Sequence, residues 1–390
     1  MANAKGRTIP YRTSRSADAA AYESGLDYSL IFVVLFMLVF GLVMLYSTSS
    51  YEAAVDYGDG AYYLKRQAIF IVIGLIAMTA VTYIPLSWWH GLYGLLYAAS
   101  LGMLFLLIPF GTTVNGATRW LYIGPVSIQP AEVSKLAVIV LSAVWLSNIG
   151  RTQLQTWKGF WLILLPAIVQ AAAIYLISSN LSSALIVVLI AAAMMFVTSE
   201  DYRRYILLAV IVIIAAAVVV YLAVESGSDG GFRFQRILAW LDPTAYSDST
   251  ALQTIQGLYG IGSGGIFGKG LGQSIQKLGY VPEAQNDMIF SIICEELGLF
   301  GAISIIVLFL ILAWRMMKIA MNARTLFESL LVVGVMSHIM IQVILNIAVV
   351  TNTIPNTGVT LPFFSYGGSA IFFLLIEIGL VLNVSRSSTR

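Results

Sequence analysis

A chain of 390 residues in which 59% are hydrophobic and only 10% are charged cannot form an ordinary soluble domain, where about a quarter of the residues carry charge. The mean hydropathy of +0.88 instead indicates a protein that lies in lipid. A net charge of +2 gives no basis for nucleic-acid binding, and the single cysteine excludes an intrachain disulfide. We therefore expect an all-α integral membrane protein.

The first 28 residues are polar and basic, and the apolar run after them is too long for the core of a cleaved signal peptide. At about 20 apolar residues per span, the sequence predicts ten transmembrane helices in a single membrane domain over 29–384, followed by a short tail over 385–390. The predicted spans are 29–47, 67–84, 91–109, 133–149, 160–177, 181–198, 204–224, 288–314, 327–350 and 363–384.

The distribution of positive charge predicts the orientation of these spans. Most of the 21 lysines and arginines fall in tails and short loops on the side of the two termini, which predicts cytoplasmic N and C termini. The one large polar segment, 225–286 between the seventh and eighth spans, then faces the extracytoplasmic side, where chemistry has no ATP. It contains an amphipathic stretch over 232–241.

A glycine-rich run from Gly257 to Gly272 ends this loop. It satisfies GxGxxG, but no strand–turn–helix unit surrounds it, so a nucleotide site is a weak interpretation. Two other interpretations stay open. The glycines can give backbone flexibility or close helix packing, or they can shape a loop that forms an extracytoplasmic substrate groove.

Carboxylates follow the glycine-rich run along the chain. Asp287 stands where the eighth span begins, so it can cap that helix, act as a general base whose pKa burial adjusts, or do both. Glu295, Glu296 and Glu377 lie inside predicted spans, where a structural ion pair is the expected role of each. We expect Lys135 to pair with Glu295.

Four basic residues are predicted to gather near the outer leaflet: Lys65, Arg66, Arg119 and Lys135. They can hold a lipid diphosphate, or they can anchor to lipid headgroups. Trp120 gives its neighbour Arg119 a surface for stacking. The two histidines, His90 and His338, lack ligand-like spacing, so no histidine metal site is predicted.

Three segments, together with the ten-span layout, resemble a known family. The segments are GATRWLYIGPVSIQPAEVSKLA from Gly116 to Ala137, GIGSGGIFGKGLGQSIQKLGYVPEAQNDMIFSIICEELGLFG from Gly260 to Gly301, and NTIPNTGVTLPFFSYGGSA from Asn352 to Ala370. They resemble the SEDS family (shape, elongation, division and sporulation) over about residues 27–386. The resemblance is stronger to the division and sporulation members than to the elongation members.

The resemblance implies a peptidoglycan glycosyltransferase that polymerises lipid II at the outer face of the bacterial cytoplasmic membrane, with inversion, and releases undecaprenyl diphosphate. The implied partners are lipid II, the growing glycan strand, a class B penicillin-binding protein that crosslinks the strands, and other division or elongation proteins, but no nucleic acid. No tightly bound cofactor is expected, and a divalent cation, magnesium or manganese, is left open.

The resemblance also assigns site residues. The essential loop aspartate of the family falls on Asp287, which we expect to be the catalytic base. No metal ligand is assigned. The residues expected to bind substrate are Arg119, Trp120, Glu132, Lys135, Lys269, Lys277, Glu283, Ser365, Gly367 and Gly368. Among these, Arg119, Lys135 and one or both loop lysines would hold the diphosphate.

The sequence departs from the family pattern at two places. Ser179-Asn180-Leu181 stands where Pro-Asp-Leu is common, so Asn180 could take over only the hydrogen bonding of that aspartate. Gln285-Asn286 stands where His-Thr is usual. Two rival functions also stay open: a lipid II flippase and a noncatalytic scaffold for a penicillin-binding protein. The outer-face position of the motifs favours the polymerase, since alternating access would also need residues near the inner leaflet.

Overall fold

The structure, a computed structural model, describes residues 25–114, 117–124, 126–149, 151–199, 202–226, 231–246 and 251–388. In this part of the chain ten helices are long and apolar enough to cross a membrane, which confirms the predicted fold class. They are α1 (Tyr28–Tyr57), α2 (Tyr62–Tyr83), α3 (Leu86–Phe110), α4 (Pro130–Asn148), α6 (Trp157–Ser178), α7 (Leu181–Thr198), α8 (Arg203–Ser226), α11 (Ile289–Met321), α12 (Leu326–Val350) and α13 (Gly368–Ser388). A single-turn helix, α5 (Arg151–Leu154), joins α4 to α6.

The tenth span differs most from its predicted bounds. Helix α13 begins only at Gly368, because the preceding residues form a turn in which Phe363 takes a left-handed conformation (φ 67°). The helix then continues to Ser388, so most of the predicted C-terminal tail is helical. Residues 1–24 of the predicted N-terminal tail and residues 227–230 and 247–250 of the predicted loop lie outside the described residues.

Local sequence sets the ends of the first helix. Asp27 Oδ1 accepts a hydrogen bond of 2.9 Å from the backbone N–H of Leu30, as an N-cap does. Gly58 ends α1 in the left-handed conformation (φ 70°), which a glycine adopts without strain. Asp27 also forms a 2.6 Å ion pair with Arg315 of α11, so the start of α1 is held against the far end of the eighth span.

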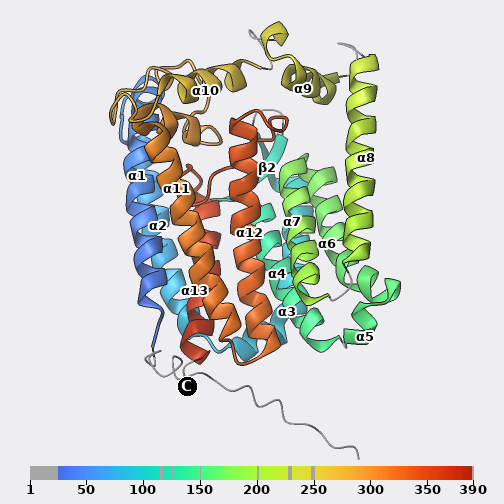
Figure 1. The fold of residues 1–390 in the computed structure, drawn as a ribbon. Helices are drawn as coiled ribbons and strands as arrows, with labels where there is room; N and C mark the ends of the chain where they lie inside the picture. Colours follow the sequence, from blue (N-terminus) through green and yellow to red (C-terminus); the bar gives the residue numbers. More distant parts are fainter. Residues whose placement is uncertain are drawn as a thin grey trace, which may run out of the picture.

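The bundle has a clear centre and a clear edge. In α4, 89% of the spanning segment is buried, whereas in α8 only 6% is buried. Figure 1 shows α8 at the rim of the bundle and α12 among its neighbours near the middle. Most side chains of α4, and of α12, in which 61% of the spanning segment is buried, are therefore shielded from lipid, and these two helices can carry polar groups into the membrane.

A small antiparallel sheet between α3 and α4 was not predicted from the sequence. Its strands run in the order β1 (Gly111–Val114), β2 (Ala117–Ile123) and β3 (Val126–Ile128). Thr112 of β1 faces Trp120 of β2, and Leu121 of β2 faces Ile128 of β3. The sheet holds Arg119 and Trp120 in a defined place at the end of the bundle.

The large loop forms a cap over one end of the bundle, opposite the chain's C terminus (Figure 1). Its elements are α9 (Gly231–Leu241), the 3₁₀ turn η3 (Thr244–Tyr246) and α10 (Leu252–Ser263). Helix α9 confirms the predicted amphipathic stretch over 232–241. The indole N–H of Trp240 donates a 3.0 Å bond to the carbonyl of Asn352, which ties α9 to the segment after α12.

The glycine-rich run packs directly on α11. The backbone N–H groups of Lys269 and Gly270 donate 2.9 Å bonds to the carbonyls of Glu295 and Glu296, and the N–H of Leu299 donates a 2.9 Å bond to the carbonyl of Gly265. Helix α11 is interrupted at this contact, where Gly298 has φ 67° and a Cβ would lie 2.4 Å from the nitrogen of Gly268. Close packing against a broken helix therefore explains Gly264 and Gly268, where a Cβ would lie within about 2 Å of a carbonyl oxygen of α11.

Candidate active site

Asp287 lies between the cap and the first turn of α11, and only 9% of it is exposed. Gln253 Nε2 of α10 donates a 2.9 Å bond to Asp287 Oδ1. Asn346 Nδ2 of α12 donates a 2.8 Å bond to the backbone carbonyl of Asp287. Burial raises the pKa of Asp287 to about 6, with a smaller contribution from the charge of Glu283. A carboxylate with this pKa suits a general base that works near neutral pH.

The second oxygen of Asp287 faces a backbone segment that lacks a side chain. A Cβ on Gly358 would lie 3.8 Å from Oδ2, and Gly358 has φ +67°, a conformation that favours glycine. Asn356 shapes this segment, since its Oδ1 accepts from the Gly358 N–H at 3.1 Å and its Nδ2 donates to Gln253 Oε1 at 2.8 Å. Gln253 thus fixes the carboxylate through Oδ1. Beside Oδ2, position 358 is a glycine, so no side chain there obstructs that oxygen.

Two arginines, one from the cap and one from the sheet, lie in line with this carboxylate: Arg236 is close enough to interact with the charge of Asp287, and Arg119 with the charge of Arg236. Arg236 of α9 donates through Nη1 to the carbonyl of Asn356 at 3.4 Å. Burial lowers the pKa of Arg119 on β2, and the positive charge of Arg236 lowers it further. Burial also lowers the pKa of Arg236, while the charge of Asp287 acts in the opposite direction.

Two guanidinium groups close enough to repel each other form a site that suits an anion with more than one charge, such as a diphosphate. Arg119 Nε adds to this interpretation, since it is buried without a hydrogen-bond partner in the described residues. Arg236 was missed as a site residue because the sequence places it only on an amphipathic segment of the loop.

Glu132 and Lys135 lie deeper in the bundle than Asp287, by about one turn of α12. They form a 2.7 Å ion pair in α4, and Lys135 is only 2% exposed. Lys135 Nζ also donates to Gln342 Oε1 at 3.1 Å. Gln342 precedes Asn346 by one turn of α12, so the ion pair lies roughly 6 Å along the helix axis from the contact with Asp287. The predicted pairing of Lys135 with Glu295 is wrong, because Glu295 is on α11 and binds another lysine.

That lysine is Lys269, whose Nζ lies 2.7 Å from Glu295 Oε1. Next to it, Lys277 Nζ lies 2.8 Å from Glu296 Oε1 and donates to Ser47 Oγ of α1 at 3.1 Å. We call these two ion pairs the loop clamp, because they hold the glycine-rich run on α11. The clamp begins about 12 Å along α11 from Asp287, so the structure separates the two loop lysines from the arginines.

The remaining predicted residues divide between the rim of the site and the turn before α13. Glu283 is exposed, with its Oε2 accepting from Asn286 Nδ2 at 2.8 Å. Trp120 is half-buried beside Arg119 on β2. On α2, Lys65 binds Asp59 at 2.7 Å, and Arg66 lies over the ring of Tyr62, so this pair does not join the two arginines.

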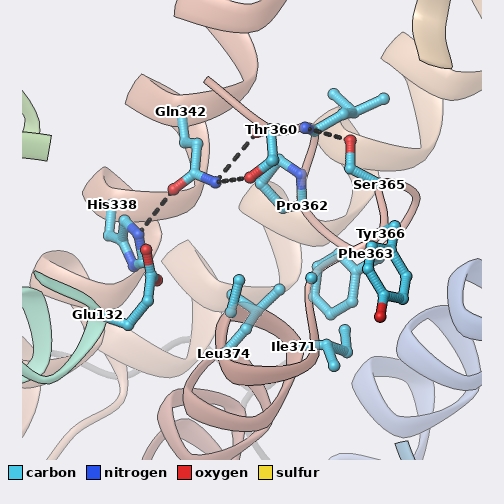
Figure 2. A pocket seen from close by; sticks show the side chains of 13 residues that line it. Glu132, His338, Gln342, Thr360, Pro362, Phe363, Ser365, Tyr366, Ile371 and Leu374 are labelled. Atoms are coloured by element: carbon cyan, nitrogen blue, oxygen red, sulfur yellow. Dashed lines mark hydrogen bonds between the residues drawn. The ribbon is translucent and has the colours of Figure 1, made fainter. Parts of the chain in front are cut away.

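The turn before α13 is held by hydrogen bonds to its own backbone and to α2. Ser365 Oγ accepts from the N–H of Leu361 at 2.8 Å, and the N–H of Gly367 donates to Gln67 Oε1 at 3.2 Å. A Cβ on Gly368 would lie 2.5 Å from the ring of Phe70, so only glycine fits there. Figure 2 shows Ser365 and Tyr366 at one side of a small cavity that Glu132, His338 and Gln342 also line.

One departure from the family pattern has a structural role here. Asn180 Oδ1 accepts from the backbone N–H of Ser183 at 3.0 Å and caps the start of α7. The described residues contain no group of three or more His, Cys, Asp or Glu side chains that could hold a metal ion. The divalent cation stays a prediction.

The fold and site define a multi-pass membrane protein with a carboxylate buried beneath a polar cap and two arginines, one on the cap and one on the sheet. The sequence matches the family of FtsW, RodA and SpoVE, described as cell cycle protein, over residues 28–390. Stage V sporulation protein E of Bacillus subtilis is 38% identical, covering 93% of this chain and 97% of the relative. A probable peptidoglycan glycosyltransferase FtsW of Trichlorobacter lovleyi is 36% identical, covering 92% of this chain and 93% of the relative.

Solved structures agree with these relatives. One chain, from a structure described as the structural coordination of polymerization and crosslinking by a peptidoglycan synthase complex, has a TM-score of 0.74 and 28% identity over 93% of this chain and 98% of that chain. The rod shape determining protein RodA of Thermus thermophilus has a TM-score of 0.66 and 26% identity over 94% of this chain and 98% of that chain. The protein belongs to the FtsW/RodA/SpoVE family.

Proposed function

We propose that this protein is a peptidoglycan glycosyltransferase that polymerises lipid II and releases undecaprenyl diphosphate. The observation that carries the proposal is the buried carboxylate of Asp287, with a pKa raised to about 6, near Arg236, whose charge in turn repels that of Arg119. Sugar transfer from a diphosphate needs this combination, since a base must take the proton of the acceptor hydroxyl and cations must stabilise the leaving group.

In the proposed reaction, the 4-hydroxyl of the acceptor sugar approaches Asp287 Oδ2, the oxygen that faces Gly358. The hydroxyl oxygen attacks C1 of the donor sugar while its proton passes to Asp287. The C1–oxygen bond to the diphosphate breaks, and the bonding electrons leave with the diphosphate. Attack from the side opposite the leaving group turns an α-linked donor into a β-linked unit of the strand.

The leaving diphosphate takes up negative charge as the bond breaks. Arg119 and Arg236 are assigned to hold it at the mouth of the site, and Lys135 is assigned to its deeper side. Lys135 is paired with Glu132, so the diphosphate would share the ammonium of Lys135 with that carboxylate or displace the carboxylate from it. The proposed role of Lys269 and Lys277 is to hold the loop that positions Asp287, in addition to any contact with substrate.

Orientation and partners complete the proposal. Ten spans place both termini on one side, and the excess of basic residues on that side favours the cytoplasm. The cap and Asp287 would then face outward, where lipid II and the growing strand meet. Similarity to a chain of a peptidoglycan synthase complex supports a class B penicillin-binding protein as partner.

The test is formation of glycan strands from purified lipid II by the protein, co-purified in detergent with its cognate class B penicillin-binding protein. Moenomycin is present to inhibit contaminating classical glycosyltransferases, and an equally folded Asp287→Asn variant is compared. We expect strands from the parent protein and strand formation slower by about 10²-fold or more in the variant. Absence of strands from an intact parent complex would contradict the proposal and favour lipid transport, and equal strands from both would exclude Asp287 as the base.

A further inference from the structure

A row of buried polar side chains connects α4, α12 and α13 in the middle of the bundle. Lys135 Nζ donates to Gln342 Oε1 at 3.1 Å, and His338 Nε2 lies 3.0 Å from the same oxygen. On the other side of the imidazole, His338 Nδ1 lies 2.7 Å from Glu377 Oε2. Ionisable groups inside a membrane are costly and are usually functional. The mechanism above uses Lys135 but neither His338 nor Glu377.

The amide of Gln342 has only one orientation that suits its neighbours. Its Nε2 donates to the carbonyl oxygen of Thr360 at 3.0 Å, as Figure 2 shows, and to the hydroxyl of the same residue at 3.2 Å. The reversed amide would turn its oxygen toward that carbonyl and its N–H groups toward the ammonium of Lys135, which has no acceptor. Gln342 Oε1 therefore faces both Lys135 and His338.

This orientation determines where His338 carries hydrogen. Because Gln342 Oε1 can only accept, His338 Nε2 must be a donor. The short contact between Nδ1 and Glu377 Oε2 then needs a second hydrogen, which lies on the imidazole or on the carboxyl. In either form the two side chains together have no net charge, and a neutral pair is far less costly in the bilayer interior than a single charge.

We propose that His338 and Glu377 are a positioning pair for Lys135. Glu377 holds the imidazole, the imidazole holds the carbonyl oxygen of Gln342, and that oxygen holds the ammonium of Lys135 where the diphosphate is proposed to bind. Outer partners commonly orient binding groups in this manner at metal sites. The proposal rests on the proposed function, because Lys135 is assigned there to the leaving diphosphate.

A cavity of about 20 Å³ adjoins this row of polar side chains, with His338, Gln342 and Glu132 among its lining residues. It has room for about one water molecule. The cavity gives the carboxylate of Glu132 space to move when Lys135 turns toward a phosphate, while the imidazole keeps Gln342 in place. His338 thus acts on substrate binding, through Gln342 and Lys135, and not on the chemical step.

The first test is a double-mutant cycle on KM for lipid II. In the complex with the penicillin-binding protein, the apolar double variant His338→Leu/Glu377→Leu should raise KM by about three- to tenfold with little change in kcat. In a Lys135→Met background the same double change should alter KM by less than about twofold. Glu377→Gln should restore KM to about the parent value, because its amide can donate to Nδ1 and leave Nε2 as the donor.

The matched control is Ser142→Ala. This change removes a buried hydroxyl on α4, the helix that carries Lys135, and the hydroxyl has no hydrogen-bond partner in the described residues. It should leave KM unchanged. A parental KM in the apolar double variant, or an equal rise in the parent and Lys135→Met backgrounds, would overturn the proposal. If the parent complex makes no strands at all, the proposed function fails, and the second measurement still tests the pair.

The second measurement needs neither activity nor an apolar variant. The chain has two histidines, so His90→Asn leaves His338 as the single ¹⁵N-histidine signal. At pH 7 we expect Nε2 to carry a covalently attached hydrogen. We also expect the ¹⁵N shift of Nδ1 to be perturbed by its contact with Glu377 and to change in Glu377→Gln. A hydrogen on Nδ1 with a bare Nε2 would contradict the derived arrangement and overturn the proposal.

Discussion

The cap contacts α11 through Asp287 near the start of the helix and through the two glutamates of the loop clamp further along it. These carboxylates differ in whether a cation pairs with them. Glu295 and Glu296 are fully buried and each meets a lysine within 2.8 Å. Asp287 is nearly as buried, but it receives a neutral amide from Gln253, and burial raises its pKa to about 6. A carboxylate paired with a lysine stabilises the fold, whereas Asp287, which forms no ion pair within the described residues, is available for chemistry.

Breaking the clamp should give the largest effect on stability. In Glu296→Gln the ammonium of Lys277 stays buried without its carboxylate, so we expect a loss of about 3–5 kcal/mol in the free energy of unfolding. Denaturant or thermal unfolding in detergent measures this loss, with Glu283→Gln, at an exposed carboxylate, as the matched control. A stability equal to that of the parent would show that the clamp does not hold the loop.

Removing either arginine should reduce activity rather than stability. Each of Arg119→Gln and Arg236→Gln loses a charge-assisted contact with the diphosphate, which should lower kcat/KM by roughly 10- to 100-fold. Because the two guanidiniums repel each other without substrate, neither change should destabilise the protein. Initial rates of strand formation and unfolding midpoints test both statements, and Lys65→Gln is the control at an exposed ion pair. Unchanged rates would remove the arginines from the site.

The pH dependence of the rate reports the state of Asp287. Its carboxylate form increases as the pH rises through about 6, so the rate at saturating lipid II should rise about tenfold between pH 5 and pH 7. Unfolding midpoints at each pH show that the protein remains folded over this range. A rate that does not change between these pH values would contradict the assignment of Asp287 as the base.

Gln253→Leu should give the smallest effect. The variant removes the 2.9 Å hydrogen bond to Asp287 Oδ1, which favours the carboxylate, so the midpoint of the pH profile should move to higher pH. At pH 7 the rate should fall by about two- to fivefold. Gln256→Leu on the same helix is the control, and an unshifted profile would mean that Gln253 only supports the loop.

The sequence predicted the spans well because about 20 apolar residues in a row have few alternatives in lipid. It did not predict the three-stranded sheet, whose strands are short and lack a strong alternating pattern, nor the late start of α13, which depends on a left-handed Phe363. Apolar character alone does not distinguish a helix from a turn that is buried by its neighbours.

For the candidate site, residue types were predictable but partners were not. Asp287 and Lys135 could be found from position and resemblance, yet the pairing of Lys135 with Glu132 rather than Glu295 depends on how α4 and α11 are placed in the bundle. Gln342 and Asn346 could have been noticed as polar residues one turn apart in an apolar span. Their contacts follow only from three-dimensional packing.

The burial that prepares Asp287 for chemistry has a cost in stability. Since its pKa is about 6 in the folded protein and 3.8 ordinarily, the folded state holds more protons between those values, and stability falls as the pH rises through that window. At pH 7 the full cost is present, so Asp287→Asn should raise the free energy of unfolding by up to about 3 kcal/mol.

The most direct measurement is therefore to record the unfolding midpoint and the strand yield of the parent and of Asp287→Asn in the same preparations at pH 7. We expect the variant to be more stable than the parent and to form strands about 10²- to 10⁴-fold more slowly. A variant that is less stable, or one that forms strands at the parent rate, would contradict this expectation.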